Sequence, residues 1–122
     1  YGLAPGQVHA LKVKDYTQID RLMPPGRTAA YRRLGVSVID HLILEHLLGI
    51  AREDQEGKLA YDIDRDVVTR AVSGGDYQLA LLHSPMRTSV IKDIADATDR
   101  MPRKATYFHP KLPSGLVFYR LG

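Results

Sequence analysis

The sequence has no cysteine, which excludes disulfide bonds, thiol nucleophiles and thiolate metal sites. It has no apolar run near the ~20 residues of a membrane-spanning helix, because Glu45 and His46 interrupt the longest apolar stretch, residues 42–50. It also begins without an initiator methionine and without the basic-then-apolar order of a signal peptide. From these absences we expect no membrane association, a cytoplasmic location, and a chain excised from a longer protein.

The charges are nearly balanced. Seventeen lysines and arginines face fourteen aspartates and glutamates, which gives a net charge of +3. This excess permits anionic partners but is too mild to favour nucleic acid. A length of 122 residues with 44% hydrophobic and 25% charged residues is typical of one globular domain spanning residues 1–122.

Hydrophobic periodicity predicts alternating strands and helices. Strands are expected over residues 7–14, 59–63, 77–82, 105–108 and 116–121, and helices over residues 16–22, 37–48, 65–72 and 84–98. The order β-α-α-β-α-β-α-β-β predicts an α+β fold of the α/β-like kind. We therefore expect a two-layer sandwich with a mixed sheet.

The predicted helices carry recognisable end signals. Asp15 and Asp64 are good N-caps for two short helices, and the Gly74–Gly75 pair suits the left-handed end of the second. Ser37 resembles the N-cap of the long central helix, and Asp40, three residues later, approximates a capping box. These signals predict where the helices begin and end.

The central helix also carries two histidines near a glutamate. His41 and Glu45 are one turn apart on its polar side, which predicts a surface pair, while His46 falls toward the apolar stripe that includes Leu47 and Leu48. His41 and His46 are five residues apart, which places them roughly 140° apart around an α-helix. The two histidines therefore cannot chelate one metal ion without distortion. A core or half-buried histidine is expected here, and no metal site.

Two charged stretches are interpreted as connections between elements. Residues 27–33 include Arg27 and Tyr31 and are interpreted as a solvated linker, either helical or mobile. Residues 51–58 are interpreted as a charged loop. Neither stretch is predicted to form a site.

Ser84 is a first candidate for anion binding. It follows the near-continuous apolar run 77–82 and precedes Pro85 at the predicted start of a helix. Helix N-termini at the carboxyl ends of strands attract anions through free backbone donors and the helix dipole. Ser84 could bond a phosphate there, or it could simply cap the helix.

The closing segment, residues 101–116, is the second candidate. Lys104 and Lys111 bracket Thr106 and His109, and in a strand Lys104 and Thr106 would share one face. A lysine beside a hydroxyl suits a carboxylate or a phosphate. The alternative is that the lysines and prolines of this segment protect an edge strand from pairing.

The same segment reads Met101-Pro-Arg-Lys-Ala-Thr-Tyr-Phe-His-Pro-Lys-Leu-Pro-Ser-Gly-Leu116. It resembles the closing motif of the bacterial proteins grouped as domain of unknown function 1015, with Ala105 in place of their usual serine. Residues 34–41, 48–50 and 78–85 also fit the carboxyl half of that family. The resemblance marks Met101, Pro102, Lys104, Thr106, Phe108, Pro110, Lys111 and Gly115.

The resemblance implies a carboxyl-terminal region whose partner is an upstream domain of the same protein. That upstream part of the family carries an Asp-Gly-His-His-Arg-like stretch, which this chain lacks. The stretch is similar to one in the ParB-like nucleotide-dependent fold, some of whose members phosphorylate free serine. The resemblance therefore implies a kinase-like role for the longer protein.

Together these observations predict a site for a small anionic ligand, a nucleotide phosphate or an amino-acid carboxylate. Its expected residues are Ser84, Lys104, Thr106, His109 and Lys111. The alternative is a non-catalytic interaction or assembly module that packs against the upstream domain or a second copy of the chain. The sequence identifies neither a catalytic residue nor a cofactor.

Overall fold

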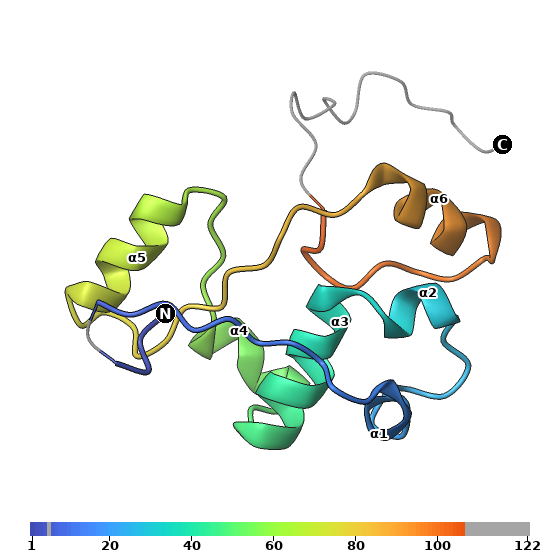
Figure 1. Cartoon of the computed structure of the whole chain (residues 1–122), viewed down its shortest axis with the longest axis horizontal. Helices are drawn as coiled ribbons and strands as arrows, with labels where there is room; N and C mark the ends of the chain where they lie inside the picture. Colours follow the sequence, from blue (N-terminus) through green and yellow to red (C-terminus); the bar gives the residue numbers. More distant parts are fainter. Residues whose placement is uncertain (5, 107–122) are drawn as a thin grey trace, which may run out of the picture.

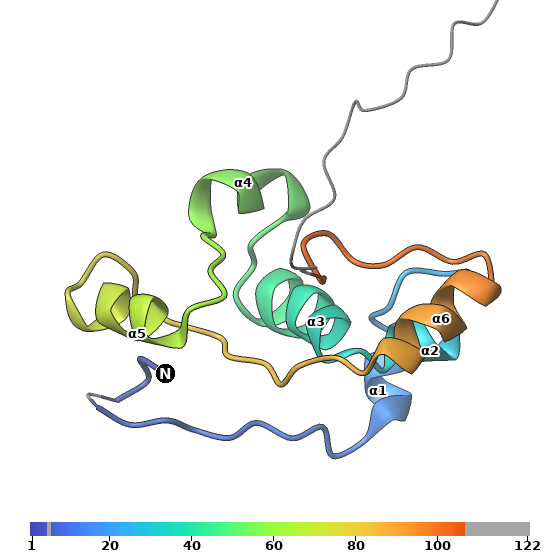
Figure 2. The same ribbon diagram turned by 90° about the horizontal axis from the view of Figure 1, so that it is seen from above.

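The computed structural model describes residues 1–4 and 6–106, and this part of the chain is built of short helices. In chain order they are α1 (Tyr16–Asp20), α2 (Ala29–Arg32), α3 (Gly35–Val38), η1 (Ile39–Leu47), η2 (Arg52–Asp54), α4 (Gln55–Lys58), α5 (Arg65–Ser73) and α6 (Thr88–Asp96). Figure 1 shows α5 at one end of the molecule and α1, α2 and α6 at the other, with α3 and α4 between them. The perpendicular view in Figure 2 shows the same order.

Residues 1–4 and 6–106 contain no β-strand, so the predicted α+β sandwich with a mixed sheet is wrong. Residues 7–14 form an exposed, extended segment that leads to α1 (Figure 1). Residues 77–82, predicted as a buried central strand, expose Tyr77 and Leu82 and pair with Tyr1 at Ala80 alone. A strand needs a neighbour along its whole length, and apolar composition does not supply one.

The last two predicted strands have different outcomes. The strand predicted over residues 105–108 is preceded by a turn, and its first two residues are irregular. The rest of that strand and the one predicted over residues 116–121 lie outside the described residues.

The buried core is small and lies among the helices at one end of the molecule. Ile19 of α1, Met23 and Val38 of α3 form its centre, and Val13 and Leu42 pack against them. Helix α2 packs on α6, where Tyr31 and Ile94 are each 1% exposed. The core thus holds together α1, α2, α3 and α6, which carry or support the site described below.

Two predicted helix caps are confirmed. The Asp15 Oδ1 atom accepts a hydrogen bond from the Thr17 backbone N–H at 2.8 Å, and α1 begins at the next residue. The Asp64 Oδ1 atom accepts one from the Asp66 backbone N–H at 2.8 Å at the start of α5. Aspartate succeeds at these positions because its carboxylate satisfies donors that the first helical turn leaves free.

Two other predicted caps are wrong. The central helix begins at Gly35, so Ser37 lies inside it, where it is fully buried. Helix α6 begins at Thr88, preceded by Arg87 without a side-chain cap, so Ser84 lies in the connection before it. Both serines were assigned from local pattern, whereas tertiary packing set the ends of these helices.

The central helix widens after α3 into the π-helix η1. Its last bond, from the Leu48 N–H to the Ile43 carbonyl at 2.9 Å, spans five residues. Widening changes which side chains face inward: His41 is 3% exposed, whereas Leu47 is 65% exposed. His41, predicted on the polar surface of the helix, is buried, and Leu47, predicted in the apolar stripe, is exposed. The prediction assumed the 3.6-residue turn of an α-helix, which does not apply to a π-helix.

Candidate functional site

A tight turn places Lys104. The Ala105 N–H donates to the Pro102 carbonyl at 3.4 Å, and Lys104 within the turn has φ of 52°. This left-handed conformation costs a non-glycine residue roughly 1–2 kcal/mol. The Lys104 ammonium lies 4.6 Å from the centroid of the Tyr61 ring. Lys104 is thus presented by a turn, and the strand face that it was predicted to share with Thr106 does not form.

Lys104 is one of the residues lining a cavity of about 120 Å³. Segments far apart in the chain build its wall: the approach to α2, η1, η2, α4, the following connection and the Lys104 turn. Its cationic lining residues are Arg27, Arg52, Arg103 and Lys104, and its acidic ones are Asp40 and Glu56. Four cations against two carboxylates make the cavity a site for negative charge.

A hydrogen-bonded network centred on the buried His41 and Tyr31 lies beside this cavity. The His41 ring contacts the Tyr31 hydroxyl through Nε2 at 3.2 Å and the Glu45 carboxylate through Nδ1 at 3.0 Å. Arg52 joins both ends: its Nε donates to Glu45 at 3.0 Å, and its Nη2 lies 3.3 Å from His41 Nε2. Since Tyr31 and Arg52 also line the cavity, the network connects the cavity wall to a buried imidazole.

The partners of His41 determine its tautomer. An ionised carboxylate only accepts, so Nδ1 carries the proton and donates it to Glu45. A guanidinium only donates, so Nε2 accepts from Arg52. The geometry therefore describes a neutral His41. The Tyr31 hydroxyl lies 3.2 Å from the same atom, so in this state it shares the one lone pair of Nε2 with Arg52.

Two carboxyl groups and one phenol in or beside the cavity, those of Asp40, Glu45 and Tyr61, have shifted pKa values. Burial raises the pKa of Asp40, although His41 and Arg52 act against this shift. Burial, with the nearby Asp40 charge, also raises the pKa of Tyr61. For Glu45, burial acts upward, but hydrogen bonds from His41 and Arg52 hold its pKa below the usual range. The network thus keeps Glu45 ionised, while Asp40 takes up a proton more readily than an ordinary aspartate.

Asp99 holds the approach to α2 in place. Its carboxylate accepts from the Thr28 backbone N–H at 2.9 Å, the Thr28 hydroxyl at 3.0 Å and the Arg27 guanidinium at 2.6 Å. The Arg27 guanidinium also stacks 4.4 Å from the centroid of the Tyr31 ring. Asp99 therefore fixes Arg27 and, through it, one wall of the cavity.

The structure describes three of the predicted site residues, Ser84, Lys104 and Thr106, and it does not bring these three together. Lys104 lines the cavity, but Thr106 is exposed outside its lining. Ser84 is exposed in the connection before α6 and also lies outside the lining. His109 and Lys111 lie outside the described residues. Within the described residues 1–4 and 6–106, Lys104 is the one predicted site residue that lines the cavity.

Sequence reasoning missed the residues that make up most of the cavity. Arg27 and Tyr31 come from the stretch interpreted as a solvated linker, and Arg52 from the stretch interpreted as a charged loop. Asp40 was assigned to a capping box. A usable signal was present, because Arg27 and Tyr31 place a cation and an aromatic ring one turn apart, but nothing local joins them to Arg52.

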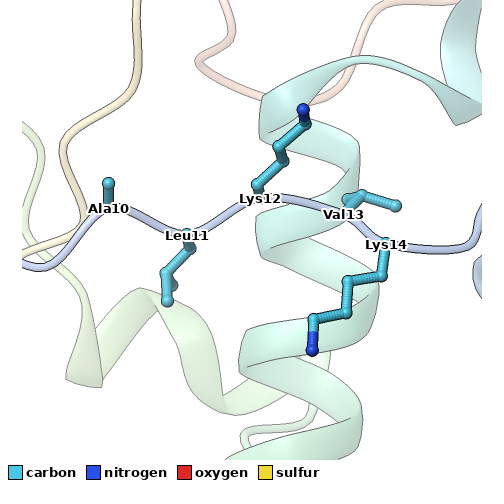
Figure 3. A pocket seen from close by; sticks show the side chains of 5 residues that line it. All are labelled: Ala10, Leu11, Lys12, Val13 and Lys14. Atoms are coloured by element: carbon cyan, nitrogen blue, oxygen red, sulfur yellow. The ribbon is translucent and has the colours of Figure 1, made fainter.

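Other features of the described residues offer weaker sites. A hollow beside the extended segment is lined by five consecutive residues, with Leu11 and Lys12 pointing to opposite sides (Figure 3), so no groups from separate elements converge on it. Across residues 1–4 and 6–106, no three histidine or carboxylate side chains are grouped so that they could hold a metal ion. Nor does any helix there have the length and apolar character of a membrane span.

Comparisons of the chain with protein-family models, with curated proteins and with solved structures give no match. The resemblance to the domain of unknown function 1015 proteins therefore stays a prediction. The functional argument depends on the geometry and charge of the cavity.

Proposed function

We propose that the chain binds a small anion in the cavity lined by Arg27, Arg52, Arg103 and Lys104. The convergence of these four cations on one hollow carries the proposal. The cations come from three segments: Arg27 before α2, Arg52 of η2, and the turn that holds Arg103 and Lys104. Arg27 and Arg52 are also paired, with Asp99 and Glu45. Around the cavity itself the cations outnumber the carboxylates, and an anion there would relieve the repulsion among them.

The size of the cavity limits the ligand. The cavity volume of about 120 Å³ equals the volume that about four water molecules occupy in the liquid. Pockets for drug-sized ligands span roughly 300–1,000 Å³. The cavity therefore suits a sulfate, a phosphate group or a carboxylate. If the ligand is a nucleotide, one phosphate group enters the cavity and the rest lies outside.

Strain at Lys104 provides a clean test. Lys104→Gly relieves the left-handed conformation, roughly 1–2 kcal/mol, and loses the cation–π contact with Tyr61, about 0.5–1 kcal/mol. Its stability should therefore match or exceed that of the parent. Its sulfate affinity should fall about fivefold, equivalent to ~1 kcal/mol, because one cation is gone. Affinity is measured by NMR titration at constant ionic strength, and stability by urea unfolding.

Lys12→Gln is the matched control. Lys12 is exposed on the extended segment, so this variant changes the net charge equally without touching the cavity. Its sulfate affinity should equal that of the parent. Equal affinities in Lys104→Gly and the parent, or equal losses in both variants, would show that general charge and not the cavity attracts the anion.

We also propose that this anion site belongs to a longer bacterial protein related to the domain of unknown function 1015 family. The motif around Lys104 supports this proposal, since the same lysine is the one in the cavity. The upstream domain would then contribute the remaining groups of a kinase-like site.

A non-catalytic interaction module is the second candidate. It is favoured by large apolar side chains left in solvent, among them Ile63 at 74% and Leu11 at 68% exposure. Surfaces of this kind are covered when a partner docks. Sulfate titration distinguishes the anion-binding protein from the interaction module. A module without a ligand would bind no sulfate, at any sulfate concentration at which the parent and Lys12→Gln stay folded.

A further inference from the structure

His41 contacts two lining residues of the anion cavity, Tyr31 and Arg52, without lining the cavity itself. We propose, on the basis of the anion site above, that His41 is a proton-responsive positioning residue for Arg52. While unprotonated, it holds the guanidinium. When an anion in the cavity draws Arg52 away, His41 takes up a proton. Anion binding and proton uptake are then one coupled event.

The donor and acceptor chemistry of the contacts supports the coupling. A protonated His41 carries hydrogen on both ring nitrogens, so Nε2 no longer accepts. The Tyr31 hydroxyl adapts by turning its oxygen toward Nε2–H, since a hydroxyl both donates and accepts. Arg52 cannot adapt, because a guanidinium has no acceptor. The 3.3 Å hydrogen bond between Arg52 and His41 therefore requires the neutral form of the His41 ring.

The anion competes with His41 for the same guanidinium. Arg52 holds Glu45 through Nε and His41 through Nη2, and it also lines the cavity. The guanidinium has five N–H groups, so it can turn toward an anion while Nε still bonds Glu45. Turning removes Arg52 from His41 Nε2, and the Tyr31 hydroxyl that remains there can accept once Nε2 is protonated. The negative charge of the anion adds to this effect, because it stabilises an imidazolium nearby.

The charged groups around His41 permit a positive ring. Glu45 bonds Nδ1 and stays ionised, so a buried imidazolium has a carboxylate partner at 3.0 Å. Asp40, on the same helix, adds a second carboxyl nearby. Arg52 from η2 opposes the proton. Helix α2 contributes the neutral Tyr31, and the Arg27 guanidinium, from the segment before α2, stacks 4.4 Å from the centroid of the Tyr31 ring. Displacing Arg52 thus removes the nearest opposing charge.

Reciprocity fixes the sign of the effect. If the anion promotes protonation of His41, then protonation must strengthen anion binding by the same factor. Sulfate is the probe, because phosphate itself gains a proton near neutral pH. Sulfate affinity should rise about fivefold or more as pH falls from about 8 to about 5.5, across the range in which an ordinary imidazole titrates.

The variants separate His41 from other groups. His41→Gln keeps a donor and an acceptor but cannot be protonated, so its sulfate affinity should change much less over this pH range than that of the parent, leaving the contribution of Asp40. His46→Gln is the matched control, because His46 is exposed on the same helix and should leave the pH dependence intact. The Asp40→Asn variant should keep most of the pH dependence of sulfate affinity. If His41→Gln does not fold, the NMR signals of the His41 ring in the intact chain, with and without sulfate, provide the same information.

The outcomes distinguish this coupling from the anion site itself. Sulfate binding at constant affinity in the intact chain, or a pH dependence that survives in His41→Gln and disappears in Asp40→Asn, overturns the role of His41 and leaves the anion site standing. A His41 ring that keeps the same titration midpoint with saturating sulfate also overturns that role. Absence of sulfate binding at every pH overturns both proposals.

Discussion

Asp40 is the residue at which cavity charge and burial conflict most directly. It lines a cavity with excess positive charge, yet burial raises its pKa despite nearby His41 and Arg52. A carboxyl whose pKa is raised by folding binds more protons in the folded state than in the unfolded chain. Its contribution to the free energy of unfolding therefore falls as pH rises from about 3.9 through the raised value. Ionised Asp40 weakens the fold and repels an anion.

We expect Asp40→Asn to bind sulfate about fivefold more tightly at pH 7, because it removes ~1 kcal/mol of repulsion from the cavity. The free energy of unfolding at pH 7 should be unchanged or slightly higher. Glu53→Gln, an exposed acidic residue outside the lining, is the control and should leave affinity unchanged. Weaker binding in Asp40→Asn would mean that Asp40 orients a cation, and its assignment as a repelling group would be wrong.

At the scale of single elements, α5 and α6 end in the same way with different residues. In α5 the Gly75 N–H donates to the Val72 carbonyl at 3.1 Å, and in α6 the Thr98 N–H donates to the Ala95 carbonyl at 2.9 Å. In both helices the N–H of the following residue donates to a carbonyl five positions earlier. Asp76 donates to Ala71 at 2.9 Å, and Asp99 donates to Ile94 at 3.0 Å. This is the Schellman pattern, which needs a left-handed residue after the C-cap.

The two left-handed residues differ in strain. Gly75 has φ of 87°, which glycine adopts freely, whereas Thr98 has φ of 56°. A β-branched side chain is a rare outlier in this region. The α6 ending is therefore strained, and the strained residue directly precedes Asp99, which fixes Arg27.

We expect Thr98→Gly to raise the free energy of unfolding by about 0.5–1 kcal/mol, because relief of strain exceeds the greater freedom of glycine in the unfolded chain. Gly75→Thr should lower it by about 1 kcal/mol or more at the equivalent place in α5. Urea unfolding of both variants at pH 7 measures these changes. A loss of stability in Thr98→Gly would show that the threonine side chain makes a contact worth more than its strain.

Asp99 connects distant parts of the whole molecule. Its side chain is 7% exposed and ties the end of α6 to the segment before α2. Hydrogen bonds from the Thr28 backbone first, then from Arg27, Arg100 and the Thr28 hydroxyl, hold its pKa well below the usual range against the effect of burial. A carboxyl whose pKa is lowered by folding stabilises the fold above about pH 3.9, and this stabilisation is lost as pH falls toward the lowered value.

Asp99→Asn should lower the free energy of unfolding at pH 7 by about 2–3 kcal/mol, since several bonds to a charged group are lost together. The variant should also lose less stability than the parent between about pH 5 and pH 3. Asp96→Asn is the control, because its pair with Lys92 is exposed and should contribute about 0.5 kcal/mol or less. Parallel acid unfolding curves for the parent and Asp99→Asn would contradict this role.

The sequence by itself determined features that depend on a few neighbouring residues. Asp15 and Asp64 cap helices because each carboxylate reaches a backbone N–H two residues away. Gly75 closes α5 because its conformation suits glycine wherever the chain lies. Lys104 was singled out from the sequence as a cation in a proline-stiffened segment, and in the structure a turn presents it.

Tertiary structure decided the features that join distant segments. Whether residues 7–14 or 77–82 become strands depends on a partner strand, and the described residues supply none. The inward side of η1 depends on its widened geometry, which buries His41 against Tyr31. The cavity combines Lys104 with Arg27 and Arg52, two charged residues that local pattern assigns to solvent. Packing brings the three cations around one hollow, and electrostatic attraction for an anion depends on their distances in space.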